Sequence, residues 1–70
     1  MPEMHPVSSS NIAAVGYDAE SESVYVEFLN GSTYKYSGVP ASEFENLKTA
    51  SSVVSYVNRN YKNVYPFEKV

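Results

Sequence analysis

Polar and apolar residues alternate along residues 23–29, the most regular pattern in the chain. Val24, Val26 and Phe28 fall on one side of this alternation, and Tyr25, Glu27 and Leu29 fall on the other. A period of two is typical of a β-strand. Asn30-Gly31 follows and is the strongest short signal for a hairpin, because both central positions of a type I′ turn need positive φ. The sequence therefore predicts a hairpin whose second strand covers residues 32–36.

A further strand is predicted at residues 11–17, before the polar turn at 18–21. Gly38 and Pro40 end the strand over 32–36. Because the connections are short, the three strands form an antiparallel meander. Residues 1–10, with two prolines and three consecutive serines, are predicted to be an extended lead-in to a single domain over residues 11–70.

The second half of the chain predicts two short helices. Over residues 41–50, Phe44 and Leu47 share a face at i, i+3, and acidic residues stand in the early turns. Ser51 or Ser52 is a good N-cap for the second helix. Its apolar stripe would be Val53, Val57, Tyr61 and Val64, and its polar face Ser55, Arg59 and Lys62. The predicted fold class is α+β, a three-stranded antiparallel β-meander followed by two short α-helices packed on one face.

Composition removes several classes of function. The chain has 70 residues, 43% of them hydrophobic and 19% charged, which suits a small globular domain. It contains no cysteine, so disulfides, thiolate metal sites and cysteine catalysis are excluded. Its single histidine, His5, makes neither a metal site nor a catalytic triad. Apolar runs are too short for a membrane span and residues 1–6 do not resemble a signal peptide, so a cytoplasmic location without membrane contact is expected.

No catalytic arrangement stands out among the remaining residues. The serines lack a G-x-S-x-G elbow, and the glycines are too scattered for a phosphate loop. Glu20, Glu22 and Glu27 fall on a turn and a strand, where nothing desolvates one member of a catalytic pair. We therefore predict a protein that is not an enzyme and uses no cofactor or metal.

Charge is distributed unevenly along the chain. Residues 1–45 carry seven acidic residues and one base, whereas residues 46–70 carry four bases and one acidic residue, within a net charge of −3. Arg59 and Lys62 are three residues apart and would share a helix face near Asn58. These residues are the best candidates for an anion site, although a solvated helix face explains the same pattern.

Tyrosine is unusually frequent, with seven in 70 residues. Tyr34 and Tyr36 lie on one strand face and Lys35 on the other. The two rings would either fill a small core or stack on the bases of a ligand, and the sequence does not say which sheet face the helices cover. Ser10 would donate a hydrogen bond at such a site, or would serve only as a turn residue.

The chain as a whole resembles the KTSC domain family. The matching residues are Ser10-x-Ile12, Gly16-Tyr17, Val24-x-Val26-x-Phe28, Gly31, Tyr34-Lys35-Tyr36, Val39-Pro40, Ala50-x-Ser52 and Tyr56-x-Asn58-x-x-x-Lys62. The resemblance covers about residues 7–70 and implies a free-standing bacterial or phage form of a domain also found at the C-terminus of some lysyl-tRNA synthetases. Val54 stands where the family usually has glycine, and Tyr61 where an aliphatic residue is usual. The valine would fill space at the start of the second helix and obstruct a ligand there.

The attachment of the family to a synthetase suggests RNA binding. The leading prediction is thus a non-catalytic binding module for a nucleic-acid or nucleotide-type anionic ligand. Its predicted site residues are Arg59, Lys62, Tyr34, Tyr36, Asn58 and Ser10. One alternative is a small homo-oligomer, phage-encoded, that sequesters a signalling nucleotide between subunits. Another is a protein–protein interaction module that uses a strand edge or the aromatic tail.

Overall fold

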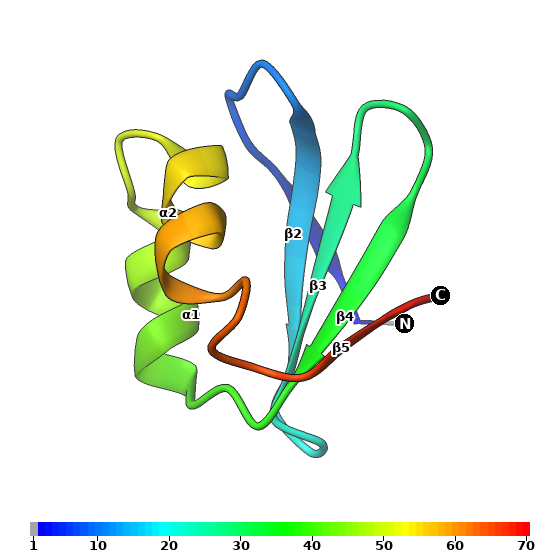
Figure 1. Cartoon of the computed structure of the whole chain (residues 1–70), viewed down its shortest axis with the longest axis vertical. Coiled ribbons are helices and arrows are strands. Elements are labelled where there is room, and N and C mark those ends of the chain that lie inside the picture. Colours follow the sequence, from blue (N-terminus) through cyan, green and yellow to red (C-terminus); the bar gives the residue numbers. More distant parts are fainter. Residues whose placement is uncertain (1) are drawn as a thin grey trace.

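The computed structural model describes residues 2–70 and has an α+β fold in which two helices cover one face of an antiparallel sheet (Figure 1). The elements in chain order are β1 (Met4–Pro6), β2 (Ile12–Asp18), β3 (Ser23–Phe28), β4 (Thr33–Ser37), α1 (Ala41–Lys48), α2 (Val53–Asn60) and β5 (Phe67–Lys69). The strands lie side by side in the order β1-β2-β3-β4-β5. The predicted class, with two helices beside an antiparallel sheet, is confirmed, but the sheet has five strands where three were predicted.

The two additional strands come from the ends of the described chain. The segment predicted as a lead-in contributes β1, which pairs with β2. Gly16 of β2 permits this pairing, because a Cβ there would lie 2.6 Å from Met4 Sδ and 2.7 Å from the Glu3 carbonyl oxygen. The tail contributes β5, which pairs with β4. Each of these strands has only three residues, too few to show an alternating pattern.

The β3–β4 hairpin is present, but its turn differs from the predicted type I′ turn. The Gly31 N–H donates to the Phe28 carbonyl (3.0 Å), and the Phe28 N–H donates to the Ser32 carbonyl (2.8 Å). Gly31 has φ +93°, and it is the only residue of this loop with positive φ. The geometry is that of a three-residue loop in which a glycine in the left-handed region follows a type I turn. Asn30 instead accepts a hydrogen bond from the Ser32 N–H through its side-chain oxygen (2.9 Å).

Helix α2 begins as predicted and ends earlier. Ser52 is its N-cap, and the Ser52 hydroxyl accepts a hydrogen bond from the Ser55 N–H. The helix stops at Asn60, the Lys62 N–H donates back to the Val57 carbonyl (2.9 Å), and Asn63 has φ +72°. The chain therefore turns before Val64, which is 60% exposed. The prediction that Val64 belongs to the apolar stripe of this helix is wrong.

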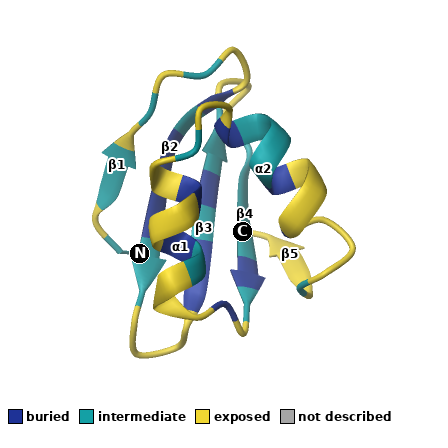
Figure 2. Ribbon diagram, turned by 90° about the vertical axis from the view of Figure 1, so that its left-hand side faces the viewer, coloured by how far each residue is buried: buried dark blue, intermediate teal, exposed yellow. Residues whose placement is uncertain are grey.

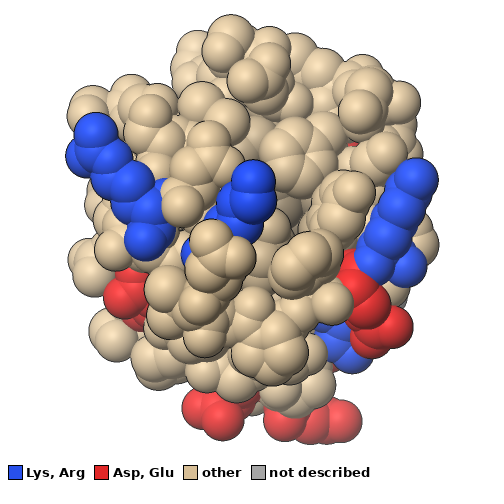
Figure 3. Space-filling view, in the orientation of Figure 1, with Lys and Arg blue, Asp and Glu red and all other residues tan. Residues whose placement is uncertain are grey.

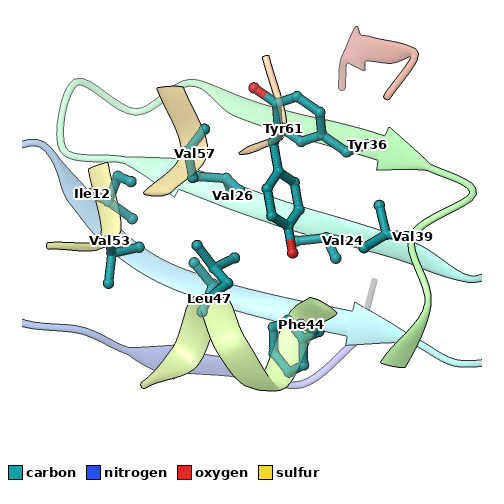
Figure 4. Close-up of a cluster of buried hydrophobic side chains, with 11 residues drawn as sticks. Ile12, Val24, Val26, Tyr36, Val39, Phe44, Leu47, Val53, Val57 and Tyr61 are labelled. Carbon is teal, nitrogen blue, oxygen red and sulfur yellow. The ribbon is translucent and has the colours of Figure 1, made fainter. Parts of the chain in front are cut away.

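The core lies between the helices and one face of the sheet. Figure 4 shows Val24 and Val26 from the sheet facing Leu47 of α1 and Val57 of α2. Tyr61 is completely buried among them, and its hydroxyl donates to the Glu43 carbonyl (3.2 Å). Figure 2, coloured by burial, shows the buried residues (dark blue) concentrated where the helices meet the sheet, while β5 is exposed. The covered face is the one that carries Tyr34 and Tyr36, because these residues pair with Val26 and Val24.

In residues 2–70, neither helix has the length and apolar character that crossing a membrane requires.

Candidate functional site

A hollow of about 340 Å³ opens between α2 and the strands β3–β5, and we call it the aromatic hollow. The sheet side of its lining is Phe28, Asn30, Tyr34, Tyr36 and Phe67. Val57 and Asn58 of α2 and Lys62, just beyond the helix, complete the lining. The volume lies within the range of small-ligand sites. Four of the six predicted site residues, Tyr34, Tyr36, Asn58 and Lys62, meet here.

The two predicted tyrosines differ in how far they reach the hollow. Tyr36 is only 5% exposed and packs edge to face against Tyr61, with ring centroids 5.5 Å apart. Burial, with a smaller contribution from neighbouring Tyr34, raises the pKa of Tyr36, so its hydroxyl stays protonated near neutrality. Tyr34 is half-buried and lies between Phe28 (5.6 Å) and Phe67 (5.8 Å). Tyr36 thus belongs to the core and the floor of the hollow, and Tyr34 to its wall.

Two phenylalanines of the hollow were not predicted as site residues. Phe67 is 54% exposed and stands over both tyrosines, 5.8 Å from Tyr34 and 5.6 Å from Tyr36. It reaches this position because β5 pairs Phe67 with Tyr36 in register. Phe28 follows from the alternation already seen in β3, since it points to the same face as Val24 and Val26. The alternation in the sequence could therefore have identified Phe28 as a site residue. Phe67 could not be identified in this way, because its position depends on the pairing of β5 with β4.

The charge of the hollow contrasts with that of the whole protein. Lys62 is exposed at its rim, and among the described residues that line it none is acidic, although the net charge of the chain is −3. Figure 3 shows the same side of the molecule as Figure 1, with Lys and Arg side chains spaced across it and acidic side chains toward its lower half. The positive charge of Lys62, with no acidic residue in the described lining, therefore favours an anion at the rim of this hollow.

Arg59 does not join Lys62 in the aromatic hollow. It lines a separate hollow of about 410 Å³ that it shares with Ser51, Ser52, Ser55 and Tyr56. The predicted pairing of Arg59 and Lys62 on one helix face is corrected, because α2 ends between them. Ser10 is exposed in the loop before β2 and is not among the residues that line the described hollows.

A third hollow, of about 460 Å³, adjoins the aromatic hollow, and we call it the amide hollow. Its lining is Asn11, Phe28, Leu29, Asn30, Val54 and Asn58. Val54 is half-buried and packs against the core. Its side chain therefore forms part of a wall here, at the start of α2 where the sequence predicted that it fills space.

The opposite face of the sheet offers a smaller aromatic and basic pair. Tyr25 and Lys35 face each other across β3 and β4, with Lys35 Nζ 6.0 Å from the Tyr25 ring centroid. The prediction that Lys35 points away from Tyr34 and Tyr36 is confirmed by this contact. This pair provides a natural comparison for the aromatic hollow, since both combine a lysine with a tyrosine.

Two tyrosine hydroxyls form hydrogen bonds that help to hold α1 and the segment before it in place. Glu43 of α1 accepts a hydrogen bond from the Tyr56 hydroxyl through its carboxylate, and this bond is the main cause of a raised Tyr56 pKa. The Tyr17 hydroxyl donates to the Val39 carbonyl at 2.7 Å. Within residues 2–70, no group of three or more His, Cys, Asp or Glu side chains is placed to hold a metal ion. The chemistry available in the aromatic hollow is stacking, hydrogen bonding and a single positive charge.

The chain matches one family model and is similar to proteins of two bacteria. The model of the KTSC domain matches residues 8–65. A protein of Tsukamurella paurometabola is 42% identical over 55 residues, which cover 79% of this chain and 82% of that protein. A protein of Stutzerimonas stutzeri is 34% identical over 56 residues, covering 80% of this chain and 79% of the relative.

A solved structure agrees with the fold over nearly the whole length. The crystal structure of a KTSC domain protein from Yersinia pestis superposes with a TM-score of 0.90 at 32% sequence identity. The match covers 97% of this chain and 96% of that one. The sheet and its two helices are therefore shared across both proteins.

Proposed function

This chain belongs to the KTSC domain family, and we propose that it is a non-catalytic module that binds a nucleotide unit, of RNA or of a smaller nucleotide, in the aromatic hollow. The observation that carries the proposal is the combination of Tyr34, Phe67 and Lys62 around one hollow with no acidic residue among its described lining. Aromatic rings suit any base, because every base has a π-face. A cation at the rim suits a phosphate.

Each side chain has a definite part in this proposal. A base would stack against Phe67 and Tyr34, whose rings border the hollow and support each other. Lys62 would pair with the phosphate, and Asn58 would hydrogen-bond to the base or the sugar. Tyr36 would shape the floor, with a hydroxyl that remains a donor. Arg59 and Ser10 have no part in this hollow and are expected to be dispensable for a single nucleotide.

The test is a titration with adenosine 5′-monophosphate followed by NMR, which reports both affinity and location for a protein of 7.8 kDa. Lys62→Gln and Tyr34→Leu should each weaken binding, the second by about 5-fold or more because base stacking contributes about 1–3 kcal/mol. Matched controls on the opposite sheet face are Lys35→Gln and Tyr25→Leu, which should leave the affinity unchanged.

The same titration can contradict the proposal. Shifts centred on Tyr25 and Lys35, with the control variants weakened instead, would place the nucleotide on the uncovered sheet face. Saturating nucleotide without shifts at Asn58 or Phe67 would remove nucleotide binding from the hollow altogether. The amide spectrum of each variant is compared with that of the wild-type protein, and an unchanged pattern for Tyr34→Leu shows that this variant still folds.

The edge of β5 favours a second candidate, a homo-oligomer that encloses the nucleotide between subunits. Ser37 and Val70 N–H groups bond across the β4–β5 pair, to Pro66 and Thr33 carbonyls (both 2.9 Å). The alternation of an antiparallel ladder then directs the backbone groups of Phe67 and Lys69 outward, at the end of the described sheet and beside the hollow. Native mass spectrometry with and without adenosine 5′-monophosphate tests this candidate, and a monomer that binds one nucleotide would exclude it.

A further inference from the structure

The aromatic hollow and the amide hollow adjoin one another, and we call the two together the groove. Both are bordered by Phe28, Asn30 and Asn58, which form the boundary that the two hollows share. The groove begins at Lys62 and Phe67 and continues between α2 and the β3–β4 hairpin to Asn11 and Val54. In Figure 1 the loop before β2, the β3–β4 loop and the start of α2 all lie at the upper end of the molecule. At about 340 and 460 Å³, each hollow alone is in the size range of a small-ligand site.

The two ends of this groove offer different chemistry. The aromatic end presents rings and the ammonium of Lys62, as described above. The far end presents the amides of Asn11, Asn30 and Asn58 around the apolar side chains of Leu29 and Val54. An amide offers two donor hydrogens and one acceptor oxygen. The Asn30 oxygen already accepts from the Ser32 N–H, so its NH₂ group is left to donate, while Asn11 and Asn58 are exposed.

This arrangement suits a base rather than a second phosphate. Amides hydrogen-bond to the polar edges of bases, and adenine in particular forms a bidentate pair with asparagine, in which its N6 amino group donates to the amide oxygen and its N7 accepts from the amide NH₂. The apolar side chains of Leu29 and Val54, which line the same hollow, give the face of a base something to contact. Among the described residues of the amide hollow there is neither a cation nor a carboxylate, so a charged group gains little there.

We propose that the groove binds two consecutive nucleotides of a single-stranded nucleic acid, with the second base held in the amide hollow by Asn11, Asn30 and Asn58. This inference rests on the proposed function of the aromatic hollow and adds a second subsite to it. The linking phosphate would lie near Asn58, which borders both hollows, on the side of Lys62. Base recognition in single strands commonly combines stacking with hydrogen bonds to base edges in this way.

The experiment compares adenosine 5′-monophosphate, the 5′-phosphorylated dinucleotide pApA and hexa-adenylate, by calorimetry and NMR on the full chain. The dinucleotide should bind about 10-fold more tightly than the mononucleotide, a gain of the size expected for one added base. Asn11→Ala should remove about 3-fold or more of this gain, the size of one hydrogen bond, and leave the mononucleotide unchanged. Asn11 is suited to this purpose because it lines only the amide hollow. Asn46→Ala, which removes an exposed amide from α1, is the matched control and should behave as wild type.

A second variant fills the subsite instead of removing a contact. Val54→Phe should abolish the gain from the second nucleotide, since the larger ring occupies the amide hollow. Its unchanged affinity for the mononucleotide would show that it still folds.

The possible failures are distinguishable. Equal affinities for mononucleotide and dinucleotide would overturn the second subsite and leave the proposed function standing. No binding of adenosine 5′-monophosphate would overturn the proposed function itself. If a neutral or acidic peptide shifts the amide signals of Asn11 and Val54 while pApA does not, the far end of the groove is a peptide site. This inference is then overturned.

Discussion

Tyr61 shows how one residue couples the core to pH. It is fully buried, and burial, followed by the nearby charge of Glu43, raises the pKa of its hydroxyl well above 10.0. In the unfolded chain the same hydroxyl would lose its proton near its ordinary pKa of about 10. Above that pH the folded state therefore binds more protons than the unfolded state, and the free energy of unfolding falls as pH rises.

Tyr61→Phe should make this alkaline loss of stability less steep. At neutral pH the variant should lose about 0.5–1.5 kcal/mol, because the hydrogen bond to the Glu43 carbonyl disappears while the ring packing remains. Part of the pH dependence will persist, since the pKa of buried Tyr36 is raised as well. Urea unfolding at several pH values between neutrality and pH ~11 measures both effects. Parallel curves for the two proteins would show that Tyr61 does not carry the linkage.

Gly16 has a role that only its neighbours reveal. A methyl group there would meet Met4 Sδ and the Glu3 carbonyl oxygen at less than 3 Å. We expect Gly16→Ala to cost about 1–3 kcal/mol, as overpacking usually does, and to displace β1. Hydrogen exchange should then accelerate at the Val7 N–H, which bonds to the Ala13 carbonyl, and much less at Phe28 in the β3–β4 hairpin. Uniform acceleration across the sheet would contradict a local effect on β1.

At the scale of elements, the sequence predicts what periodicity and caps can encode. The alternation of β3, the turn glycine Gly31 of the β3–β4 hairpin and the Ser52 cap of α2 all follow from local chemistry, and all are present. Strands β1 and β5 depend instead on pairing between distant segments, which no window of three residues can reveal. The KTSC resemblance read from short motifs is confirmed by the family match, although it did not supply these two strands.

The candidate site was predictable to the same extent. Tyr34 and Asn58 lie at this hollow on β4 and α2, two elements that the sequence predicted, and Lys62 joins them from the turn just beyond α2. Phe67 joins them only through β5. Arg59 lines a different hollow from Lys62, because α2 stops at Asn60 and the two residues no longer share a helix face. A stripe at helical spacing does not by itself say where the helix ends.

The end of α2 gives a prediction for a matched pair of valines. Val57→Ala should lower the free energy of unfolding by about 1–3 kcal/mol, because Val57 is 2% exposed and its loss leaves a cavity. Val64→Ala should change it by less than about 0.5 kcal/mol, because Val64 is 60% exposed and lies beyond the helix. Urea unfolding of the two variants measures this difference. Equal losses would mean that the apolar stripe continues through Val64 after all.

For the whole molecule, the decisive feature is an acidic protein with a groove whose described lining is free of acidic residues. The net charge of −3 repels a nucleic acid at long range, while Lys62 attracts one phosphate at short range. With so few cations, hexa-adenylate should show a shallow dependence on salt, with a slope of about −0.7 for each phosphate contacted. A steep slope would require a basic surface elsewhere, such as the hollow that Arg59 lines.

Long-range repulsion can be separated from local contact by one distant charge. Glu20 is exposed in the β2–β3 turn, at the opposite end of the molecule from the β3–β4 loop (Figure 1). Glu20→Lys changes the net charge from −3 to −1, and Glu20→Gln, to −2, is the graded control. At about 10 mM ionic strength, where the Debye length of roughly 30 Å matches the 28 Å length of the molecule, hexa-adenylate should bind about 2-fold more tightly to the lysine variant. At about 150 mM the Debye length is roughly 8 Å and the gain should vanish, since the groove itself is unchanged. A gain that survives the higher salt would mean that the ligand touches the β2–β3 turn, so that the groove is not where the strand binds.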